Sequence, residues 1–248
     1  MANLYNYGVD TATISHLIDL NRRFYQSFAN QFAITRERIQ PGVRQVLHTL
    51  GRSTRILDLG CGNGQLLREI TREGFQGQYV GVDSNGELLA HARKNVAAGV
   101  NATLIQADLA SPDWDKTLPE PQFDVILAFA SLHHFPGARL RRQILYKVRA
   151  HIDPKGRFIH SEWQFLNSPR LRKRIQAWEK AGLSEVDVDS GDYLLDWRRG
   201  GYGLRYVHHF TEEELESLAK VTGFRIVETF HSDGETGNLG LYQVWKPV

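Results

Sequence analysis

Residues 56–64 read Ile-Leu-Asp-Leu-Gly-Cys-Gly-Asn-Gly, a pattern that strongly constrains the fold. The apolar residues before the first glycine are typical of a buried parallel strand. Gly60, Gly62 and Gly64 lack a Cβ, so this loop can adopt positive φ and let a ligand lie against its backbone. A helix is predicted to begin near Gln65, with its free N–H groups facing the same place. Strand, loop and helix together predict the entry to a nucleotide-like site.

Strands and helices alternate on both sides of this loop. The β-α-β-α order predicts a mostly parallel, doubly wound sheet with right-handed crossovers. A short return between the last two strands favours an antiparallel hairpin. The pattern predicts helices over residues 11–35, 41–50, 65–73, 87–97, 139–151 and 212–221, and strands over residues 55–59, 78–82, 102–106, 123–129, 157–161, 224–230 and 240–245.

The alternation is interrupted between residues 164 and 210, which are rich in Arg, Trp, Tyr and Gly. This segment predicts only one helix, near residues 169–181. Thr211 and Glu214 then predict a capping box at the start of the last helix. We expect a single domain over residues 1–248, made of an N-terminal helical cap (1–50), a cofactor-binding core (51–163), a substrate lid (164–210) and a C-terminal helix with a β-hairpin (211–248).

The chain contains one cysteine, Cys61, which excludes an internal disulfide framework and favours a cytoplasmic location. No apolar run is long enough to span a bilayer, and the first residues lack a signal-peptide core. Cys61 could be a nucleophile, but no base sits beside it, so a packing role is favoured. The net charge of +2 argues neither for nor against nucleic acid as a partner.

Three acidic residues lie at or just after the ends of three successive predicted strands, Asp58 within the end of the first. Asp58, Asp83 and Asp108 should lie at the carboxyl edge of one sheet, where open α/β folds bind ligands. Asp83 suits a ribose diol, because a carboxylate can accept both hydroxyl protons. Asp108 is placed to accept from an adenine amino group, with Leu109 and Ala128 flanking the ring. Each Asp alone could simply cap a helix, but three at matching positions favour a ligand site.

A nicotinamide dehydrogenase is the first alternative. Its fingerprint is G-x-G-x-x-G/A, whereas this loop reads G-x-G-x-G and carries Gln65 where the third small residue is required. The C-terminal hairpin also replaces a second parallel nucleotide-binding half. Neither feature suits a dehydrogenase.

The core motifs occur in a specific order: Leu57-Asp58-Leu59-Gly60-Cys61-Gly62-Asn63-Gly64, then Val82-Asp83, Ala107-Asp108-Leu109 and Phe123-Asp124-Val125-Ile126. Over about residues 40–162 this set resembles class I S-adenosylmethionine-dependent methyltransferases. The resemblance implies a Rossmann-like α/β fold whose seven-stranded sheet has an antiparallel last strand, with S-adenosyl-L-methionine as cofactor. It also implies that the first two glycines contact the methionine part, Asp83 the ribose, and Asp108 with Leu109 the adenine.

The N-terminal helix carries Phe24-Tyr25…Phe28…Phe32…Thr35-Arg36, which resembles a helix that closes over the cofactor in many of these enzymes. Tyr25 could cover the sulfonium, and Arg36 could pair with the methionine carboxylate or remain a solvated charge. For the phenylalanines, core packing is favoured. The residues expected around the cofactor are Tyr25, Arg36, Asp58, Gly60, Cys61, Gly62, Asp83, Ser84, Asp108, Leu109 and Ala128.

Two clusters could serve the methyl acceptor, although alignment and exclusion of water can supply most of the catalysis. The first is residues 131–135, where His134 could act as a general base or hold an acceptor oxygen. A histidine bonded to nearby backbone is the alternative. The second is Gly191-Asp192…Asp196-Trp197…Arg205-Tyr206-Val207-His208-His209-Phe210-Thr211.

This second cluster resembles a segment of tRNA wobble-uridine carboxymethyl methyltransferases of the Trm-nine type. The resemblance implies methyl esterification of a carboxymethyl group, which is already deprotonated at pH 7 and needs no base. Arg205 could orient that carboxylate, with Tyr206 or His208 completing the grip. Solvated helix faces are the alternative for about half of the basic residues that could meet tRNA phosphates. These residues are Arg139, Arg141, Arg142, Lys147, Arg149, Arg170, Arg172, Lys173, Arg174, Arg198 and Arg199.

We therefore predict an S-adenosylmethionine-dependent methyltransferase with His134, Arg205, Tyr206 and His208 as catalytic residues, no metal, and a tRNA wobble uridine as acceptor. The alternatives are a small-molecule O- or N-methyltransferase and a non-catalytic cofactor-binding partner subunit. An activator subunit is a further candidate partner.

Overall fold

The computed structural model describes residues 8–35, 38–94, 96–97 and 99–248, with the backbone alone at Asn30 and residues 32–35. The helices are α1 (Thr11–Thr35), α2 (Pro41–Leu47), α3 (Gln65–Arg72), α4 (Gly86–Lys94), α5 (Ala138–His151), α6 (Pro169–Arg172) and α7 (Glu212–Val221). The strands are β1 (Arg55–Leu59), β2 (Gln78–Asp83), β3 (Asn101–Gln106), β4 (Phe123–Phe129), β5 (Ile152–Trp163), β6 (Ile175–Gln176), β7 (Asp192–Trp197), β8 (Gly203–His208), β9 (Phe224–Ser232) and β10 (Gly240–Pro247).

The main sheet has seven strands in the order β3-β2-β1-β4-β5-β10-β9. Strands β1 to β5 pair in parallel, and β10 is antiparallel to both β5 and β9. Most residues of the central strands β1 and β4 are buried, as in the register pair Leu57 and Ile126, because helices cover both faces of the sheet. The predicted α/β fold with a seven-stranded, doubly wound sheet is confirmed.

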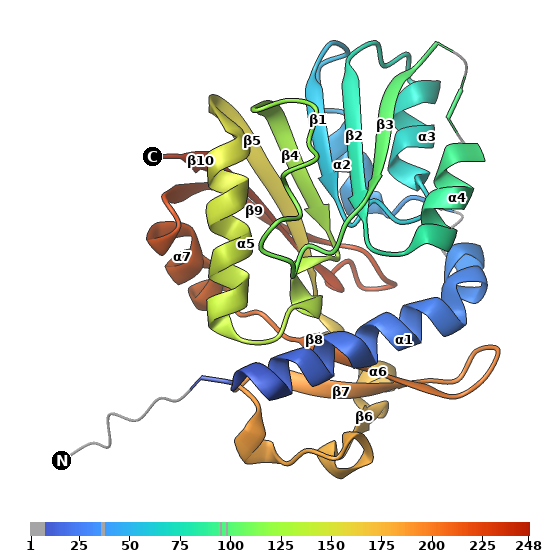
Figure 1. Ribbon diagram of the computed structural model, residues 1–248, viewed down its shortest axis with the longest axis vertical. Coiled ribbons are helices and arrows are strands. Elements are labelled where there is room, and N and C mark those ends of the chain that lie inside the picture. The colour runs from blue at the N-terminus through green and yellow to red at the C-terminus, as the bar shows by residue number, and fades with distance from the viewer. Residues whose placement is uncertain (1–7, 36–37, 95, 98) are drawn as a thin grey trace.

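Different helices cover the two faces of the main sheet. Apolar side chains of α2, α3 and α4 pack on one face, and those of α5 and α7 pack on the other. The carboxyl ends of β1 to β4 point toward α1, which crosses below them (Figure 1). The loops that follow these strands therefore meet α1, and this arrangement places the site.

Residues 164–210 contain a second sheet, antiparallel and ordered β6-β7-β8. It lies on the other side of α1 from the main sheet (Figure 1), and Leu17 of α1 packs against its Leu194 and Tyr206. The predicted helix over residues 169–181 is wrong. Helix α6 is four residues long, because the chain then extends so that β6 can pair with β7.

The start of α7 follows only half of its predicted capping box. The Thr211 hydroxyl accepts from the Glu214 N–H at 3.2 Å, as expected for an N-cap. The Glu214 carboxylate instead contacts His208 and Arg141. Among the described helices, none is both long and apolar enough to cross a membrane.

Candidate active site

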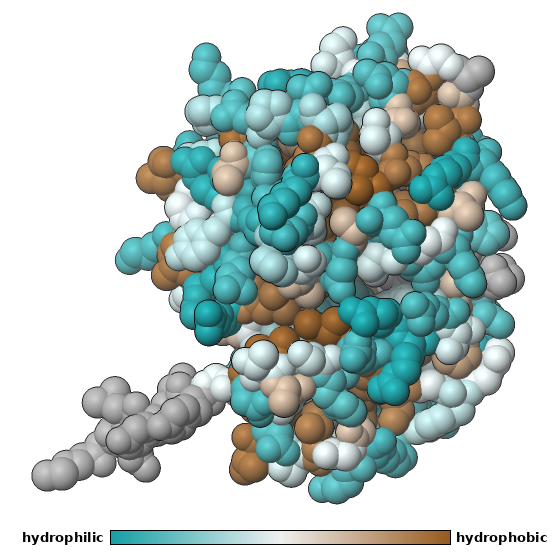
Figure 2. Space-filling view, viewed as in Figure 1, coloured by the Kyte–Doolittle hydropathy of each residue, from teal (hydrophilic) through white to brown (hydrophobic). Residues whose placement is uncertain are grey.

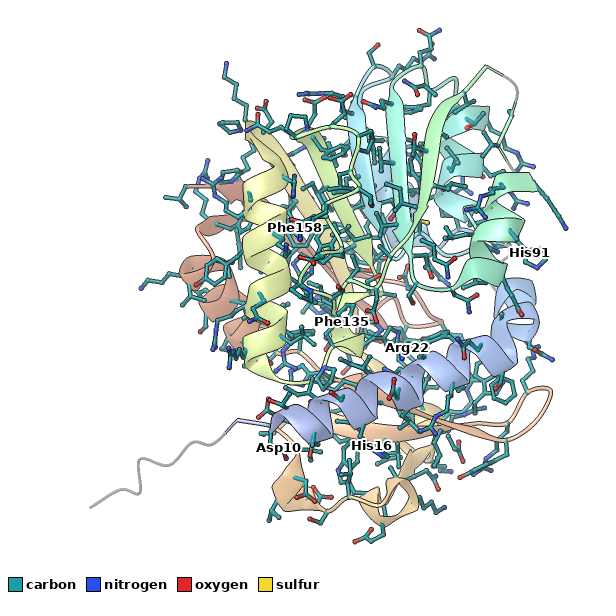
Figure 3. The ribbon with its side chains drawn as sticks, in the orientation of Figure 1. Asp10, His16, Arg22, His91, Phe135 and Phe158 are labelled. Atoms are coloured by element: carbon teal, nitrogen blue, oxygen red, sulfur yellow. The ribbon has the colours of Figure 1, made fainter. Side chains whose placement is uncertain are left out.

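A cavity of about 260 Å³ lies between the carboxyl edge of the main sheet and α1. Figure 3 labels two of its lining residues, Arg22 on α1 and Phe135 after β4. Ala128 is fully buried inside β4 and does not line the cavity, and Arg36 is outside the described residues. The predicted residues that do line it are Tyr25, Asp58, Gly60, Cys61, Gly62, Asp83, Ser84, Asp108, Leu109 and His134.

The glycine loop needs its glycines for two different reasons. Gly60, Gly62 and Gly64 have φ of +79°, +56° and +72°, in the region that favours glycine. A Cβ on Gly60 would lie 2.1 Å from the Ser131 hydroxyl, so close packing excludes a side chain there. A Cβ on Gly62 would meet nothing within 4 Å and would project into open space. The loop therefore leaves room for a ligand directly on the backbone of Gly62.

Two carboxyl groups form the floor beside this loop. The Asp83 oxygens accept the N–H groups of Gly62 at 2.9 Å and Asn85 at 2.8 Å. Burial raises the pKa of Asp83, against the lowering effect of those N–H groups. Asp58 accepts the Tyr79 hydroxyl at 2.6 Å, and burial raises the pKa of Asp58 to about 7. Both side chains offer acceptors to a ligand that brings hydroxyl or ammonium donors.

Cys61 is buried beside the same floor. Burial raises the pKa of its thiol well above the ordinary value, and the Asp58 and Asp83 carboxylates raise it further. A thiol held in its protonated form is a poor nucleophile. The environment therefore fits the packing role favoured for Cys61 and not the nucleophilic one.

An ion pair joins α1 to the end of β3 across the cavity. Arg22 lies 3.1 Å from one oxygen of Asp108, whose other oxygen accepts the Ala110 N–H at 2.9 Å. In the space-filling view, hydrophilic atoms gather over the middle of α1, where Arg22 lies (Figures 2 and 3). The sequence interpretation missed Arg22, because no local pattern relates it to a residue 86 positions away.

Tyr25 of α1 and His134 meet at the cavity. The Tyr25 hydroxyl and His134 Nε2 are 2.8 Å apart, and the two rings are edge to face. His134 belongs to a 3₁₀ turn, Leu132–His134, directly after β4. The Asn85 side chain donates to the Tyr25 carbonyl at 3.0 Å, which fixes the helix at this level.

Arg205 lies outside the cavity, in an aromatic surrounding. Its guanidinium carbon is 4.6 Å from the ring centre of Trp163, 5.5 Å from Phe24 and 5.9 Å from Trp197. Only 8% of the residue is exposed, and the guanidinium has no hydrogen bond or ion pair with any part of the chain that the structure describes. The ring centres of Phe24 and Tyr25 are 5.0 Å apart. Phe24 therefore contacts both Arg205 and Tyr25, a residue that lines the cavity.

Tyr206 and His208 are not brought to the cavity. Tyr206 donates to Asp192 at 2.6 Å, and burial raises the pKa of its phenol well above the ordinary value. The two His208 nitrogens are 2.6 Å from Asp192 and 2.8 Å from Glu214. These side chains bind β7, β8 and α7 together through hydrogen bonds that lie away from the cavity.

Several of the basic residues expected to meet phosphates are engaged elsewhere. Arg141 is buried and donates to the Phe135 carbonyl at 3.1 Å. Lys147 pairs with Asp115, and Arg149 bonds two backbone carbonyls. Arg198 pairs with Asp196.

A buried carboxyl group, that of Glu162, contacts His133, whose ring packs against that of His134. Glu162 sits 3.1 Å from His133 Nδ1 and 2.9 Å from His160 Nδ1. Burial raises the pKa of Glu162 and lowers the pKa of His160 to about 3, which favours neutral partners in the core. Within the described residues, no group of three or more His, Cys, Asp or Glu side chains could hold a metal.

Comparison with known proteins gives the family. The model of the methyltransferase domain family matches residues 31–229. The chain is 30% identical to malonyl-[acyl-carrier protein] O-methyltransferase of Halalkalibacterium halodurans, over 78% of this chain and 73% of that protein. It is 23% identical to tRNA (carboxymethyluridine(34)-5-O)-methyltransferase of Schizosaccharomyces pombe, over 82% of this chain and 88% of that protein.

A crystal structure of a SAM-dependent methyltransferase from Methanosarcina mazei is similar, with a TM-score of 0.64 and 24% identity, over 82% of this chain and 97% of that chain. This chain belongs to the methyltransferase domain family. The predicted enzyme class, an S-adenosylmethionine-dependent methyltransferase, is confirmed.

Proposed function

We propose that this chain transfers a methyl group from S-adenosylmethionine to a carboxylate oxygen of its acceptor. The observation that carries this proposal is Arg205, a buried guanidinium without an acidic partner among the described residues. A buried charge is costly unless it is paired, so such a group favours an incoming anion. Its planar fork matches the two oxygens of a carboxylate.

The cavity suits the cofactor. The open space over Gly62 can take the methionine part, Asp83 can accept from the ribose hydroxyls, and Asp108 can accept from the adenine amino group. When bound, S-adenosylmethionine supplies an electrophilic methyl group on a positively charged sulfur. The Tyr25 and His134 side chains, hydrogen-bonded to each other at 2.8 Å, line the cavity and can help to exclude water from the reacting groups.

A carboxylate acceptor removes the need for a general base. It is ionised at pH 7, so its oxygen is already nucleophilic. His134 can then stay hydrogen-bonded to Tyr25 and orient an acceptor oxygen rather than take a proton. Catalysis would depend on alignment, which Arg205 supplies at one end and the cavity at the other.

The names of the relatives support this acceptor chemistry. One describes O-methylation of a malonyl group, and the other describes O-methylation of carboxymethyluridine. Malonyl and carboxymethyl groups both end in a carboxylate. The shared chemistry agrees with an unpaired arginine on the acceptor side.

We propose tRNA, with a carboxymethyl group on its wobble uridine, as the carrier of this carboxylate. The supporting surface is at α6 and the β7–β8 turn. Here Arg170, Arg172, Lys173 and Arg199 are exposed and have no acidic partner within the described chain, and Tyr202 is 59% exposed. Unpaired cations suit phosphates, and an exposed aromatic ring, which lies here on the same turn as Arg199, suits a base. A small carboxylic acid is the second candidate, favoured by the likeness to the malonyl enzyme.

The carrier can be tested with cofactor labelled on its methyl group and fractionated lysate. Label that disappears after ribonuclease treatment supports tRNA. Label in a fraction of low molecular mass supports a small acid instead. Tight cofactor binding without label in any fraction would mean a non-catalytic partner subunit and would contradict the proposal. The Asp83→Ala protein is the blank for cofactor-dependent labelling.

A further inference from the structure

Asn21 is a buried residue of α1 whose amide joins two distant segments. Its Oδ1 accepts the Tyr206 N–H at 2.8 Å. Its Nδ2 donates to the Tyr206 carbonyl at 3.1 Å and to the His134 carbonyl at 3.3 Å. The Tyr206 N–H requires an oxygen opposite it, which fixes the orientation of the amide. Both donors and the acceptor of this side chain are therefore used.

The Asn21 side chain bonds to Tyr206 in the place where a further strand would pair with β8. β8 is an edge strand of the second sheet, so every second residue turns its N–H and C=O away from β7. At Tyr206 both groups bond to Asn21, as they would to a neighbouring strand. This contact holds β8 at the residue next to Arg205.

The third bond, from Asn21 to the His134 carbonyl, connects α1 to a residue of the cofactor cavity. His134 lines the cavity and is hydrogen-bonded to Tyr25, one helical turn after Asn21 on α1. The Asn21 amide thus bonds the backbone of His134 and the backbone beside Arg205 at once. Any change in the separation of these two segments must stretch or break one of its bonds.

We infer that Asn21 is a positioning residue that sets the spacing between Arg205 and the cofactor cavity. This inference rests on the proposed function, in which Arg205 holds the acceptor carboxylate. The spacing determines whether the carboxylate oxygen reaches the methyl group in line. A displacement of about 1 Å in such an alignment can lower the rate about 100-fold.

The substitutions can separate positioning from simple stabilisation. Asn21→Asp keeps an acceptor for the Tyr206 N–H but cannot donate to the two carbonyls when ionised. Asn21→Ala removes all three bonds. The matched control is Ser15→Ala, an exposed position of the same helix. Thermal melting reports stability, and calorimetry reports cofactor affinity.

The test is a double-mutant cycle with Arg205→Met, using the lysate fraction that the wild-type protein labels as acceptor. We expect Asn21→Ala and Asn21→Asp each to lower kcat about 30- to 100-fold in the wild-type background. Cofactor Kd should stay within about twofold, and Ser15→Ala should behave as wild type. In the Arg205→Met background the same substitutions should change kcat less than about threefold, because the positioned group is gone.

The possible failures are distinct. Unchanged turnover in Arg205→Met, or the absence of any labelled fraction, overturns the proposed function and this inference with it. Lowered but measurable turnover in Arg205→Met, combined with an equal effect of Asn21→Asp on kcat in both backgrounds, overturns the inference alone. A fall in the melting temperature of Asn21→Ala with unchanged kcat would also overturn the inference, because it would show that Asn21 has a structural role only.

Discussion

The guanidinium of Arg205 lies 4.6 Å from the ring centre of Trp163, and no acid pairs with it among the described residues. Aromatic faces stabilise a buried cation by about 0.5–2 kcal/mol, but they do not accept its N–H groups as a carboxylate does. The arrangement keeps the cation in the protein while leaving its strongest bonds for a ligand. That is the property expected of an anchor for an anionic acceptor.

Replacing Arg205 by lysine tests this role. Arg205→Lys keeps the charge but loses the planar fork and the stacking on Trp163. We expect kcat/KM for the acceptor to fall about 10- to 100-fold, with cofactor affinity unchanged by calorimetry. The exposed Arg52→Lys is the matched control. Equal kcat/KM in both variants would exclude Arg205 as an acceptor ligand.

Asp83 carries the strongest prediction about the cofactor. Asp83→Ala removes both acceptors proposed for the ribose and frees the N–H groups of Gly62 and Asn85. We expect the Kd for S-adenosylmethionine to rise at least about 100-fold, near 3 kcal/mol, by isothermal calorimetry. The exposed Asp113→Ala should bind as wild type. An unchanged affinity in Asp83→Ala would refute the assignment of the ribose site.

Asp58 provides a test at the floor of the cavity. Its pKa is raised to about 7 by burial, above the ordinary value near 3.9, so the folded protein holds a proton that the unfolded chain releases. This stabilising contribution is full at low pH and is lost as pH rises through about 7. Asp58→Asn cannot titrate. We expect the free energy of unfolding of wild type, relative to Asp58→Asn, to fall by about 2–3 kcal/mol between pH 5 and pH 8.

Chemical denaturation of both proteins across that range measures the difference. A constant difference would mean that the Asp58 carboxyl titrates alike in the folded and unfolded states.

His208 should behave as a clamp that weakens at high pH. Burial lowers its pKa, but the bonds to Asp192 and Glu214 outweigh this effect, so the net pKa is raised. The stabilising contribution is present below the ordinary value near 6.5 and is lost as pH rises through the raised pKa. His208→Gln should cost about 3 kcal/mol near pH 6 and less at pH 9. Thermal melting across this pH range checks the prediction, with His48→Gln as the control at an exposed histidine. A loss of stability in His208→Gln that grows with pH would contradict it.

Local sequence patterns were sufficient for the main sheet and its cofactor edge. The run from Phe123 to Phe129 is apolar except for Asp124, because most of β4 is buried between the helices on both faces. Asp83 ends β2 and Asp108 lies two residues after β3, so parallel pairing brings both to one edge of the sheet. Short-range patterns thus predicted ten of the residues that line the cavity.

The second sheet depended on contacts that sequence patterns do not reveal. β6 is two residues long and exists only because Ile175 pairs with Leu195. The β7–β8 hairpin had a usable signal, since Gly200 and Gly201 separate two runs of strand-forming residues. Asn21 gave none, because its partner Tyr206 is 185 positions away. Its role follows from the tertiary fold.

Methyl transfer to a carboxylate is tested most directly by the stability of the product in mild alkali. A methyl ester is hydrolysed and releases labelled methanol as a vapour, whereas methyl groups on nitrogen, carbon or an ether oxygen remain attached. With methyl-labelled cofactor, we predict volatile label from the ribonuclease-sensitive product of the wild-type protein and none from Asp83→Ala. Product label that stays bound through alkali treatment would contradict a carboxylate acceptor.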